Sequence, residues 1–307
     1  MSIRQQQQPT TSRFRSTNMS ATTGSSITLP NATQHDLTNS STGLNYRIQI
    51  SWPLNWDRTK QLRNSKVPVI YILDGNALFL TATEILWRSA SNSFYHGGGI
   101  IVAIGYQNIP TETGSLFSSQ RNTDLTINEH EVHAGLGGAD GFLEFIGREV
   151  RPLVERQFED VSIGEEAIFG HSFGGLCVLH SLFSKTGGAF DAYFAASPSV
   201  WWDAAIVEEA EKFCNAESKG TQGSLQISYG ALEQRPTRTN AESDVEFEER
   251  QMRCTERKMA DNAVELEKKL RSSGKLTKVS ITEFEGEDHG TVATSALLRA
   301  LSTFFDH

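Results

Sequence analysis

A serine flanked by glycines lies near the middle of the chain. The segment Gly170-His171-Ser172-Phe173-Gly174 fits the pattern G-x-S-x-G, in which a serine is held on a tight turn between a strand and a helix. Glycines at both ends of such a turn keep side chains apart where the backbone reverses. The letters EEAIFG before the serine are typical of a buried strand, and GLCVLHSLF after it are typical of a helix. Motif and context together predict that Ser172 is a nucleophile.

A serine hydroxyl is a weak nucleophile at neutral pH and needs a base. Where a serine occupies this kind of turn, the histidine comes last in the chain order. His289 lies between the last predicted strand and the last predicted helix, and it is therefore the expected base. His171 adjoins the serine but should point elsewhere on a tight turn, and His180 should face away on the following helix.

A carboxylate usually orients the histidine of such a site. Glu233 follows the predicted strand Leu225–Tyr229 and is the first choice. Asp203 is a more distant alternative. Asp288 is adjacent to His289, and a neighbour in sequence rarely turns back onto the ring.

Acyl transfer also requires two N–H groups that stabilise a developing oxyanion. The residue after the nucleophile, Phe173, should supply one of them. The other should come from the loop Asp74-Gly75-Asn76-Ala77, where a glycine lets the backbone approach a substrate. We expect the backbone N–H of Asn76 to be this second donor.

The segment His130-Glu131-Val132-His133 resembles a metal-binding motif. It lacks the H-E-x-x-H spacing that places two histidines on one face of a helix. We therefore expect no metal site and no cofactor.

Alternating strand and helix patterns position these residues. Short apolar runs predict strands at Tyr46–Ile50, Val67–Leu73, Ile100–Ile104, Ala167–Phe169, Tyr193–Ala196, Leu225–Tyr229 and Leu276–Phe284. Helical spacing predicts helices at Phe142–Phe158 (with Asp140 as N-cap), Phe173–Phe183, Asp203–Phe213, Met252–Leu270 and Val292–Phe305. This alternation predicts an α/β fold with a mostly parallel sheet, helices on both faces and a ligand site at the carboxyl ends of the strands. The irregular stretches 106–138 and 231–249 follow strands and should border that site.

Composition narrows the class of protein. The chain has 307 residues, 38% of them hydrophobic, and a net charge of −9, which disfavours a nucleic-acid partner. The absence of a long apolar run gives no indication of a membrane partner, and three scattered cysteines favour a reducing compartment. Residues 1–27 are rich in Gln, Ser and Thr, so we expect a disordered tail before a single domain at 28–307. The tail lacks the apolar core of a signal peptide, which predicts a cytoplasmic protein, although its arginines leave a mitochondrial presequence open.

With these pieces in place, the chain resembles the putative esterase family of α/β hydrolases. It is most similar to the branch that cleaves ester bonds in enterobactin-type or fusarinine-type siderophores, which are iron carriers. The segments that carry the resemblance are YILDGN (71–76), RNTDLT (121–126), GGADGF (137–142), GHSFGG (170–175), ASPSVWW (196–202) and DHG (288–290). The resemblance implies an α/β-hydrolase fold, a catalytic pair Ser172 and His289, and an Arg121 that contacts acyl or chelator oxygens. Some members of this branch rely on a Ser–His dyad, which leaves open whether Glu233 is needed.

These observations predict a serine-dependent carboxylic-ester hydrolase that opens a siderophore and releases iron inside the cell. The reaction would pass through an acyl-serine intermediate, and its partner would be a small ester, here a ferric siderophore. One alternative is a hydrolase of S-formylglutathione or of another small ester or thioester. A different class of alternative is a binding module that uses the same pocket without catalysis. The sequence predicts no oligomeric state.

Overall fold

The computed structural model describes residues 26–56, 66–91, 98–107, 109, 114–127, 135–217 and 223–305. Residues 31–307 cluster into one compact unit. The predicted disordered tail lies almost wholly outside the described residues, so it stays a prediction. Within the described ranges, no helix combines the length and the apolar character needed to cross a bilayer.

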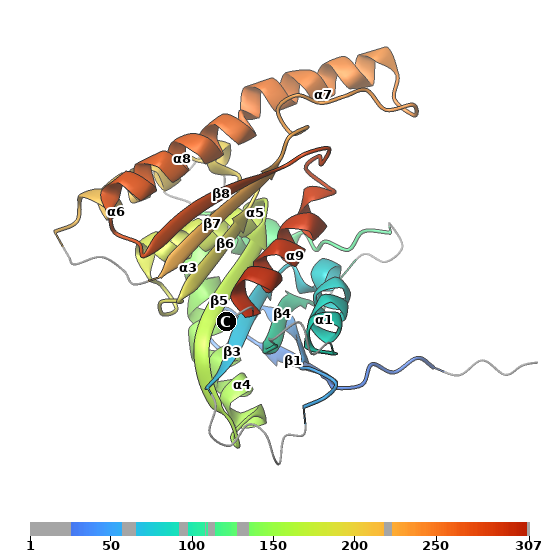
Figure 1. The fold of residues 1–307 in the computed structure, drawn as a ribbon, viewed down its shortest axis with the longest axis vertical. Helices are drawn as coiled ribbons and strands as arrows, with labels where there is room; N and C mark the ends of the chain where they lie inside the picture. Colours follow the sequence, from blue (N-terminus) through green and yellow to red (C-terminus); the bar gives the residue numbers. More distant parts are fainter. Residues whose placement is uncertain are drawn as a thin grey trace, which may run out of the picture. The chain divides into compact units, whose positions relative to one another are not determined.

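One eight-stranded sheet forms the centre of this unit (Figure 1). Its order is β1-β2-β4-β3-β5-β6-β7-β8, with β1 and β2 antiparallel to their neighbours and the other pairs parallel. The strands are β1 (Ala32–Thr38), β2 (Asn45–Ser51), β3 (Lys66–Leu73), β4 (Ile100–Tyr106), β5 (Ser162–His171), β6 (Ala192–Ala196), β7 (Ser224–Gly230) and β8 (Lys278–Phe284). The seven predicted strands are present, and the mostly parallel sheet is confirmed. The strand that sequence reasoning missed is β1, an edge strand with no buried side chain.

Helices cover both faces of the sheet. Side chains of α1 (Gly75–Ser91) and α9 (Val292–Phe305) pack into one apolar core. The opposite core is covered by α3 (Ala139–Phe145), the π-helical turn η3 (Ile146–Val150), α4 (Arg151–Gln157), α5 (Phe173–Ser184), α6 (Ala205–Asn215) and α8 (Met259–Ser273). Strands such as β3 and β4 are buried on both faces, which explains their continuous apolar sequences.

The predicted helix Phe142–Phe158 differs from the structure in two ways. It begins earlier, at Ala139 after the N-cap Gly138, so the prediction of Asp140 as N-cap is wrong. Asp140 lies in the first turn, where its charge still favours the helix dipole, and it accepts a hydrogen bond from Thr186. The helix is also interrupted by η3, where Gly147 lies so close to the Gly187 carbonyl that a Cβ would be 2.4 Å from its oxygen.

The predicted helix Met252–Leu270 is two helices. Lys258 adopts a left-handed conformation with φ 46° and divides α7 (Asp244–Arg257) from α8. This break lets Met259, Ala263, Leu266 and Leu270 of α8 pack on the sheet, while α7, which has no buried residue, extends away from α8 (Figure 1). The stretch 231–249 is therefore partly helical, because a capping box starts α7 at Asp244. A short helix α2 (Gln120–Asp124) also lies within the stretch predicted to be irregular at 106–138.

The carboxyl ends of the parallel strands lie at one edge of the sheet, where residues from distant parts of the chain meet. The segments that follow these strands are Asp74–Asn76 after β3, Ser172 after β5, Ser197–Ser199 after β6, Glu233 after β7 and His289 after β8. The topology therefore brings the predicted site residues to the edge where open parallel sheets bind ligands.

Candidate active site

Ser172 occupies the turn between β5 and α5, with φ 61° and ψ −117°. Such a conformation is costly for a residue with a Cβ and persists where the surroundings enforce it. The Ser172 N–H donates to the Ala196 carbonyl at 2.9 Å. The Ser172 carbonyl accepts from the N–H groups of Leu176 at 3.0 Å and Ser199 at 3.2 Å. These bonds hold the serine between its own helix and the neighbouring strand.

Two glycines make this turn possible. A Cβ on Gly170 would lie 2.2 Å from the Gly174 carbonyl oxygen, and one on Gly175 would lie 2.8 Å from the Ala196 carbonyl oxygen. A Cβ on Gly174 would meet nothing nearer than 3.6 Å. The steric explanation for the motif therefore holds for Gly170, while at the helix side the close approach occurs at Gly175 and not at Gly174.

His289 lies in the turn between β8 and α9, within hydrogen-bond reach of the serine. Its Nε2 is 3.0 Å from Ser172 Oγ. Asp288 Oδ1 accepts from the N–H groups of Gly290 and Thr291, both at 2.9 Å, and so shapes the turn instead of contacting the imidazole. The His289 side chain is 39% exposed, which leaves room for a ligand at the ring.

Glu233 completes a row of three side chains. Its Oε2 is 2.6 Å from His289 Nδ1, and its Oε1 accepts from Gly230 N–H at 2.7 Å and Ser197 Oγ–H at 2.5 Å. Because the carboxylate accepts from Nδ1–H, the unprotonated Nε2 faces the serine hydroxyl. The side chain is almost fully buried, and its three hydrogen bonds compensate for the loss of water.

The structure brings Glu233, and not Asp203, to the histidine. Asp203 Oδ1 accepts from the N–H of Ala205, the first residue of α6, at 2.9 Å. The alternative acid is thus engaged in a local structural role.

The two predicted oxyanion donors lie in the first turns of two helices, which follow the neighbouring strands β3 and β5. Phe173 is the first residue of α5 and Asn76 the second residue of α1, so neither N–H has a carbonyl one turn behind it in its helix. The Asn76 side chain accepts from Tyr106 N–H at 2.6 Å and donates to the Tyr106 carbonyl at 3.0 Å. These two bonds fix Asn76 against the end of β4, and its role as an oxyanion donor stays a prediction.

Arg121 lies beneath this region and makes a two-pronged ion pair with Asp74. Its Nε donates to Oδ1 at 2.7 Å and its Nη2 to Oδ2 at 2.8 Å, and both side chains are largely buried. Burial alone would lower the pKa of Arg121, but the hydrogen bonds and charge of Asp74 raise it overall. The guanidinium carbon lies 5.6 Å from the centre of the Phe173 ring. Arg121 therefore links the loop that carries Asn76 to the residue after the nucleophile, while only its Nη1 is left outside the Asp74 pair.

The helix that carries Arg121 is anchored at its other end by Asp124. This buried carboxyl accepts from Tyr46 Oη at 3.0 Å and from Gln120 Nε2 at 3.1 Å. Burial raises the pKa of Asp124 to about 6 despite these hydrogen bonds. Both ends of α2 are thus tied to the body of the sheet.

Comparison with known proteins identifies the class to which this arrangement belongs. A model of the family described as "Putative esterase" matches residues 39–275. The chain belongs to this esterase family. Two relatives resemble the esterase over most of its length. The siderophore triacetylfusarinine C esterase of Aspergillus fumigatus is 45% identical over 284 residues, which cover 91% of this chain and 95% of the relative. The siderophore enterobactin esterase of Emericella nidulans is 42% identical, covering 82% of this chain and 86% of the relative.

A solved structure agrees with these matches. The siderophore hydrolase EstB from Aspergillus nidulans superposes with a TM-score of 0.84 at 44% identity, covering 92% of this chain and 98% of the other. The predicted α/β-hydrolase fold and the prediction of a carboxylic-ester hydrolase are confirmed, and the esterase is an enzyme of this class rather than a binding module.

His171 of the esterase lies closer to the site than its sequence position predicts. Its ring does not pair with Ser172 but packs against the imidazole of His289, with ring centres 4.7 Å apart. Burial, followed by the charges of His289 and Arg121, lowers the pKa of His171 to about 3. A neutral ring therefore supports one side of His289. His180 faces away from the serine, as predicted, and pairs with Asp140 and Glu209.

Sequence reasoning missed three polar residues at this edge of the sheet. Asp74 holds Arg121, Ser197 donates to Glu233, and Ser199 Oγ lies 3.3 Å from Ser172 Oγ. The available signal was topological, because Asp74 ends a strand beside β5 and both serines end the strand on its other side. Their partners could be identified only from the folded structure.

A cavity of about 360 Å³ adjoins the catalytic row of the esterase. Glu233 and His289 line one side of it, and side chains of α7 line the other. A second hollow of about 450 Å³ shares Arg250 and Arg253 with it. The segment His130–His133 lies outside the described residues, so the expectation that it binds no metal stays a prediction.

Proposed function

We propose that this esterase hydrolyses the ester bonds of an iron-carrying siderophore. The observation that carries the proposal is the hydrogen-bonded row Glu233–His289–Ser172 in a chain that is 45% identical, over most of its length, to a siderophore triacetylfusarinine C esterase. The row supplies a mechanism for ester cleavage, and the relatives indicate which esters to test.

In the first half of the reaction, Ser172 Oγ attacks the ester carbonyl carbon while His289 Nε2 takes the hydroxyl proton. Glu233 accepts a hydrogen bond from Nδ1–H and stabilises the imidazolium that forms. The carbonyl oxygen becomes an oxyanion, which accepts from the backbone N–H groups of Phe173 and Asn76. The C–O bond to the leaving alcohol then breaks, and His289 returns the proton to that alcohol.

In the second half, water attacks the acyl-serine with His289 as base. The acyl–oxygen bond to Ser172 breaks, the serine regains its proton, and the product leaves as a carboxylic acid. Opening the first ester of a cyclic chelator gives a linear chain that has lost the preorganisation of the ring, and cleaving the further esters separates the chelating groups, so iron is bound less tightly. Iron enters this scheme as the cargo of the substrate.

The hydrolysis products of purified protein test the proposal. Ferric and iron-free forms of a triester trihydroxamate and of a catecholate trilactone are incubated with the enzyme, and the products are identified by mass spectrometry. We expect ring opening with the addition of one water per ester, no reaction with Ser172→Ala, and labelling of Ser172 by a fluorophosphonate probe. A higher kcat/KM on S-formylglutathione or on a long-chain p-nitrophenyl ester would reject the siderophore assignment. Cytoplasmic location stays a separate prediction, which fractionation of cells would test.

A further inference from the structure

The helix α7 presents charged side chains toward the catalytic cavity although it contributes nothing to the core. It has no buried residue, and it joins α8 through the left-handed Lys258. Because no residue of α7 is buried, the contacts that position it are polar ones, among them the capping box and the bonds of Arg250 to Glu242. Its position relative to His289 therefore depends on the segment that precedes it.

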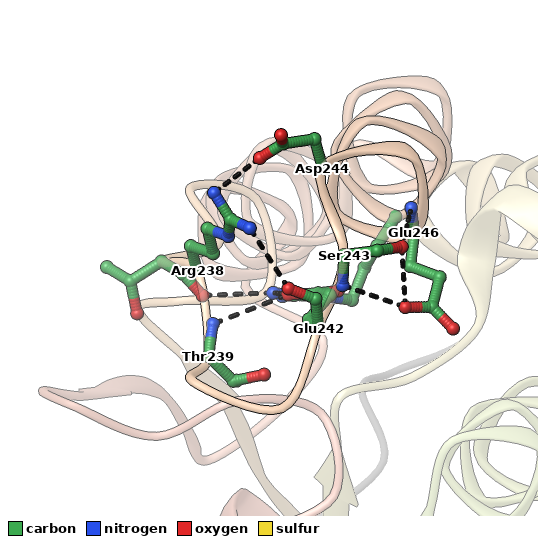
Figure 2. A network of polar contacts seen from close by, with 8 residues as sticks. Arg238, Thr239, Glu242, Ser243, Asp244 and Glu246 are labelled. Carbon is green, nitrogen blue, oxygen red and sulfur yellow. Dashed lines mark hydrogen bonds and ion pairs between the residues drawn. The ribbon is translucent and has the colours of Figure 1, made fainter.

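That segment forms a hydrogen-bonded network at the start of α7 (Figure 2). Ser243 Oγ accepts from Glu246 N–H at 3.3 Å, and the Glu246 side chain accepts from Ser243 N–H at 2.8 Å, which makes a capping box. Arg238 pairs with Asp244 and donates to the Glu242 carbonyl at 3.2 Å (Figure 2). The network fixes the direction in which α7 leaves the loop.

Arg250 belongs to this network, so its charge is not available to bind an anion in the cavity. Its Nε and Nη2 each donate to the Glu242 carboxylate at 2.7 Å, and these bonds lower the pKa of Glu242 to about 2. Arg250 also donates to the Thr237 carbonyl at 2.9 Å. Its charge is therefore neutralised by a close carboxylate.

The next two arginines of α7 are different. Arg253 and Arg257 lie four residues apart, on one face of the helix, and both line the 360 Å³ cavity that His289 and Glu233 also line. In the part of the chain that the structure describes, the one carboxylate that Arg253 pairs with is Glu249, at 3.8 Å, and both side chains of this pair are exposed. The guanidinium carbon of Arg257 lies 4.5 Å from the centre of the Trp201 ring. Among the described residues, no ion pair within 4 Å neutralises Arg257.

The two carboxylates of the same cavity keep their negative charges, but among the described residues neither forms an ion pair with Arg253 or Arg257. Glu233 is engaged by His289, Gly230 and Ser197, and Asp288 by the turn that follows it. A chain with a net charge of −9 thus places two arginines beside its catalytic histidine, Arg253 with one exposed ion pair at 3.8 Å and Arg257 with none among the described residues. Arginine forks bind anionic oxygens with charge-assisted hydrogen bonds.

We infer that Arg253 and Arg257 form an anion subsite that holds the negatively charged iron-chelating oxygens of the substrate beside Ser172 and His289. The inference rests on the proposed siderophore esterase function and narrows its substrate class. A ferric tris-catecholate complex is a trianion, whereas a ferric tris-hydroxamate complex is neutral. The subsite therefore favours the catecholate class, which gains direct attraction to both guanidinium groups.

Binding of chelates that contain no ester separates this subsite from catalysis. The probes are a hexadentate ferric tris-catecholamide and a neutral hexadentate ferric tris-hydroxamate, both with amide backbones, and the full chain is titrated by calorimetry. In the variant Arg253→Gln/Arg257→Gln, the dissociation constant of the trianion should rise about ten- to hundredfold, as expected for lost charge-assisted hydrogen bonds. That of the neutral complex should change much less.

Two further variants control for other effects. The double variant Arg253→Gln/Arg257→Met keeps an apolar stem over Trp201 and should show the same loss of affinity for the trianion. If affinity falls with Arg257→Gln but not with Arg257→Met, the cause is damaged packing and the subsite is overturned. Lys268→Gln removes one positive charge from the exposed face of α8, outside the cavity, and should leave both affinities unchanged. Equal weakening of the two complexes, or an equal effect of Lys268→Gln, would overturn the inference. Arginine-dependent binding without cleavage of any siderophore would overturn the proposed function alone.

Discussion

The two hydrogen bonds of His289 decide how much each residue of the catalytic row contributes. His289→Ala removes the group that accepts the serine proton, and we expect kcat to fall by about 10⁶-fold. Glu233→Gln should be milder, with a loss of about 10⁴-fold against about 10⁶-fold for loss of the base, because the acid orients the ring and transfers no proton. The amide would also place an NH₂ group against Gly230 N–H or His289 Nδ1–H. Steady-state kinetics on one ester measures both variants, and wild-type turnover in Glu233→Gln would indicate a Ser–His dyad.

Arg121 holds Asp74 in place, which is a role separate from the substrate contact expected from the sequence. Its paired bonds to Asp74 hold the loop of Asn76, and a lysine cannot reproduce the two-pronged geometry. We expect Arg121→Lys to lower kcat by about tenfold, through a loosened oxyanion donor, with little change in KM. The two constants, measured on one siderophore ester, separate the roles. A raised KM at unchanged kcat would instead support the direct contact with acyl or chelator oxygens that the resemblance implies.

At the scale of secondary structure, apolar runs and helical spacing predicted most of the elements that form the core, but sequence reasoning missed the helix α1, whose apolar side chains are buried in it. The buried strands β3, β4 and β6 have continuous apolar sequences, and the motif around Ser172 fixes its turn, so both could be identified from local residues. The edge strand β1 has no buried side chain and contacts β2 through its backbone and through polar side chains such as Asp36, which pairs with Arg47, and this leaves no hydrophobic pattern to detect. The break at Lys258 contains neither glycine nor proline. It arises because α8 packs on the sheet and α7 does not, which is a tertiary effect.

The same limit applies to the candidate site. Ser172 and His289 follow from a motif and from chain order, and Glu233 from its place after a strand. The pair Arg121–Asp74 and the face of Arg253 and Arg257 depend on segments that meet only after folding. Residues that act through a partner on another element are therefore the ones that local sequence patterns do not reveal.

Three helices on one face of the sheet are joined by a buried histidine. His180 of α5 contacts Glu209 of α6 at 2.8 Å and Asp140 of α3 at 3.0 Å. Burial acts to lower the pKa of His180, but its hydrogen bonds and the charges of both carboxylates raise it overall above 6.5. Burial likewise acts to raise the pKa of Asp140, but hydrogen bonds from Thr186 and His180 lower it overall. The charged pair therefore stabilises the fold at pH values above the ordinary pKa of an aspartate and below the raised pKa of His180.

The sign of the resulting pH effect follows from linkage. A raised folded-state pKa contributes stability that is complete below the unfolded pKa of 6.5 and is lost as pH rises through the folded value. We expect His180→Gln to lower the free energy of unfolding by about 1–3 kcal/mol near pH ~6, and by less near pH ~9. Urea unfolding of both proteins at the two pH values measures this difference. A cost that does not depend on pH would show that His180 acts by packing alone.

At the scale of the whole molecule, two electrostatic effects of opposite sign act on an anionic chelate. The net charge of −9 repels a trianion at long range, whereas Arg253 and Arg257 attract it within the cavity. Salt screens both effects, and the Debye length of about 10 Å at ~0.1 M salt is longer than the contact between an arginine and its ligand. In the wild-type protein the close contacts dominate, so added salt should weaken binding of the ferric tris-catecholamide. In Arg253→Gln/Arg257→Gln only the repulsion remains, so added salt should leave binding unchanged or strengthen it. Affinities measured over a salt series test this change of sign, with the neutral tris-hydroxamate as a control that should show little dependence in either protein. Parallel salt dependences in the two proteins would mean that the attraction of anions comes from elsewhere on the surface.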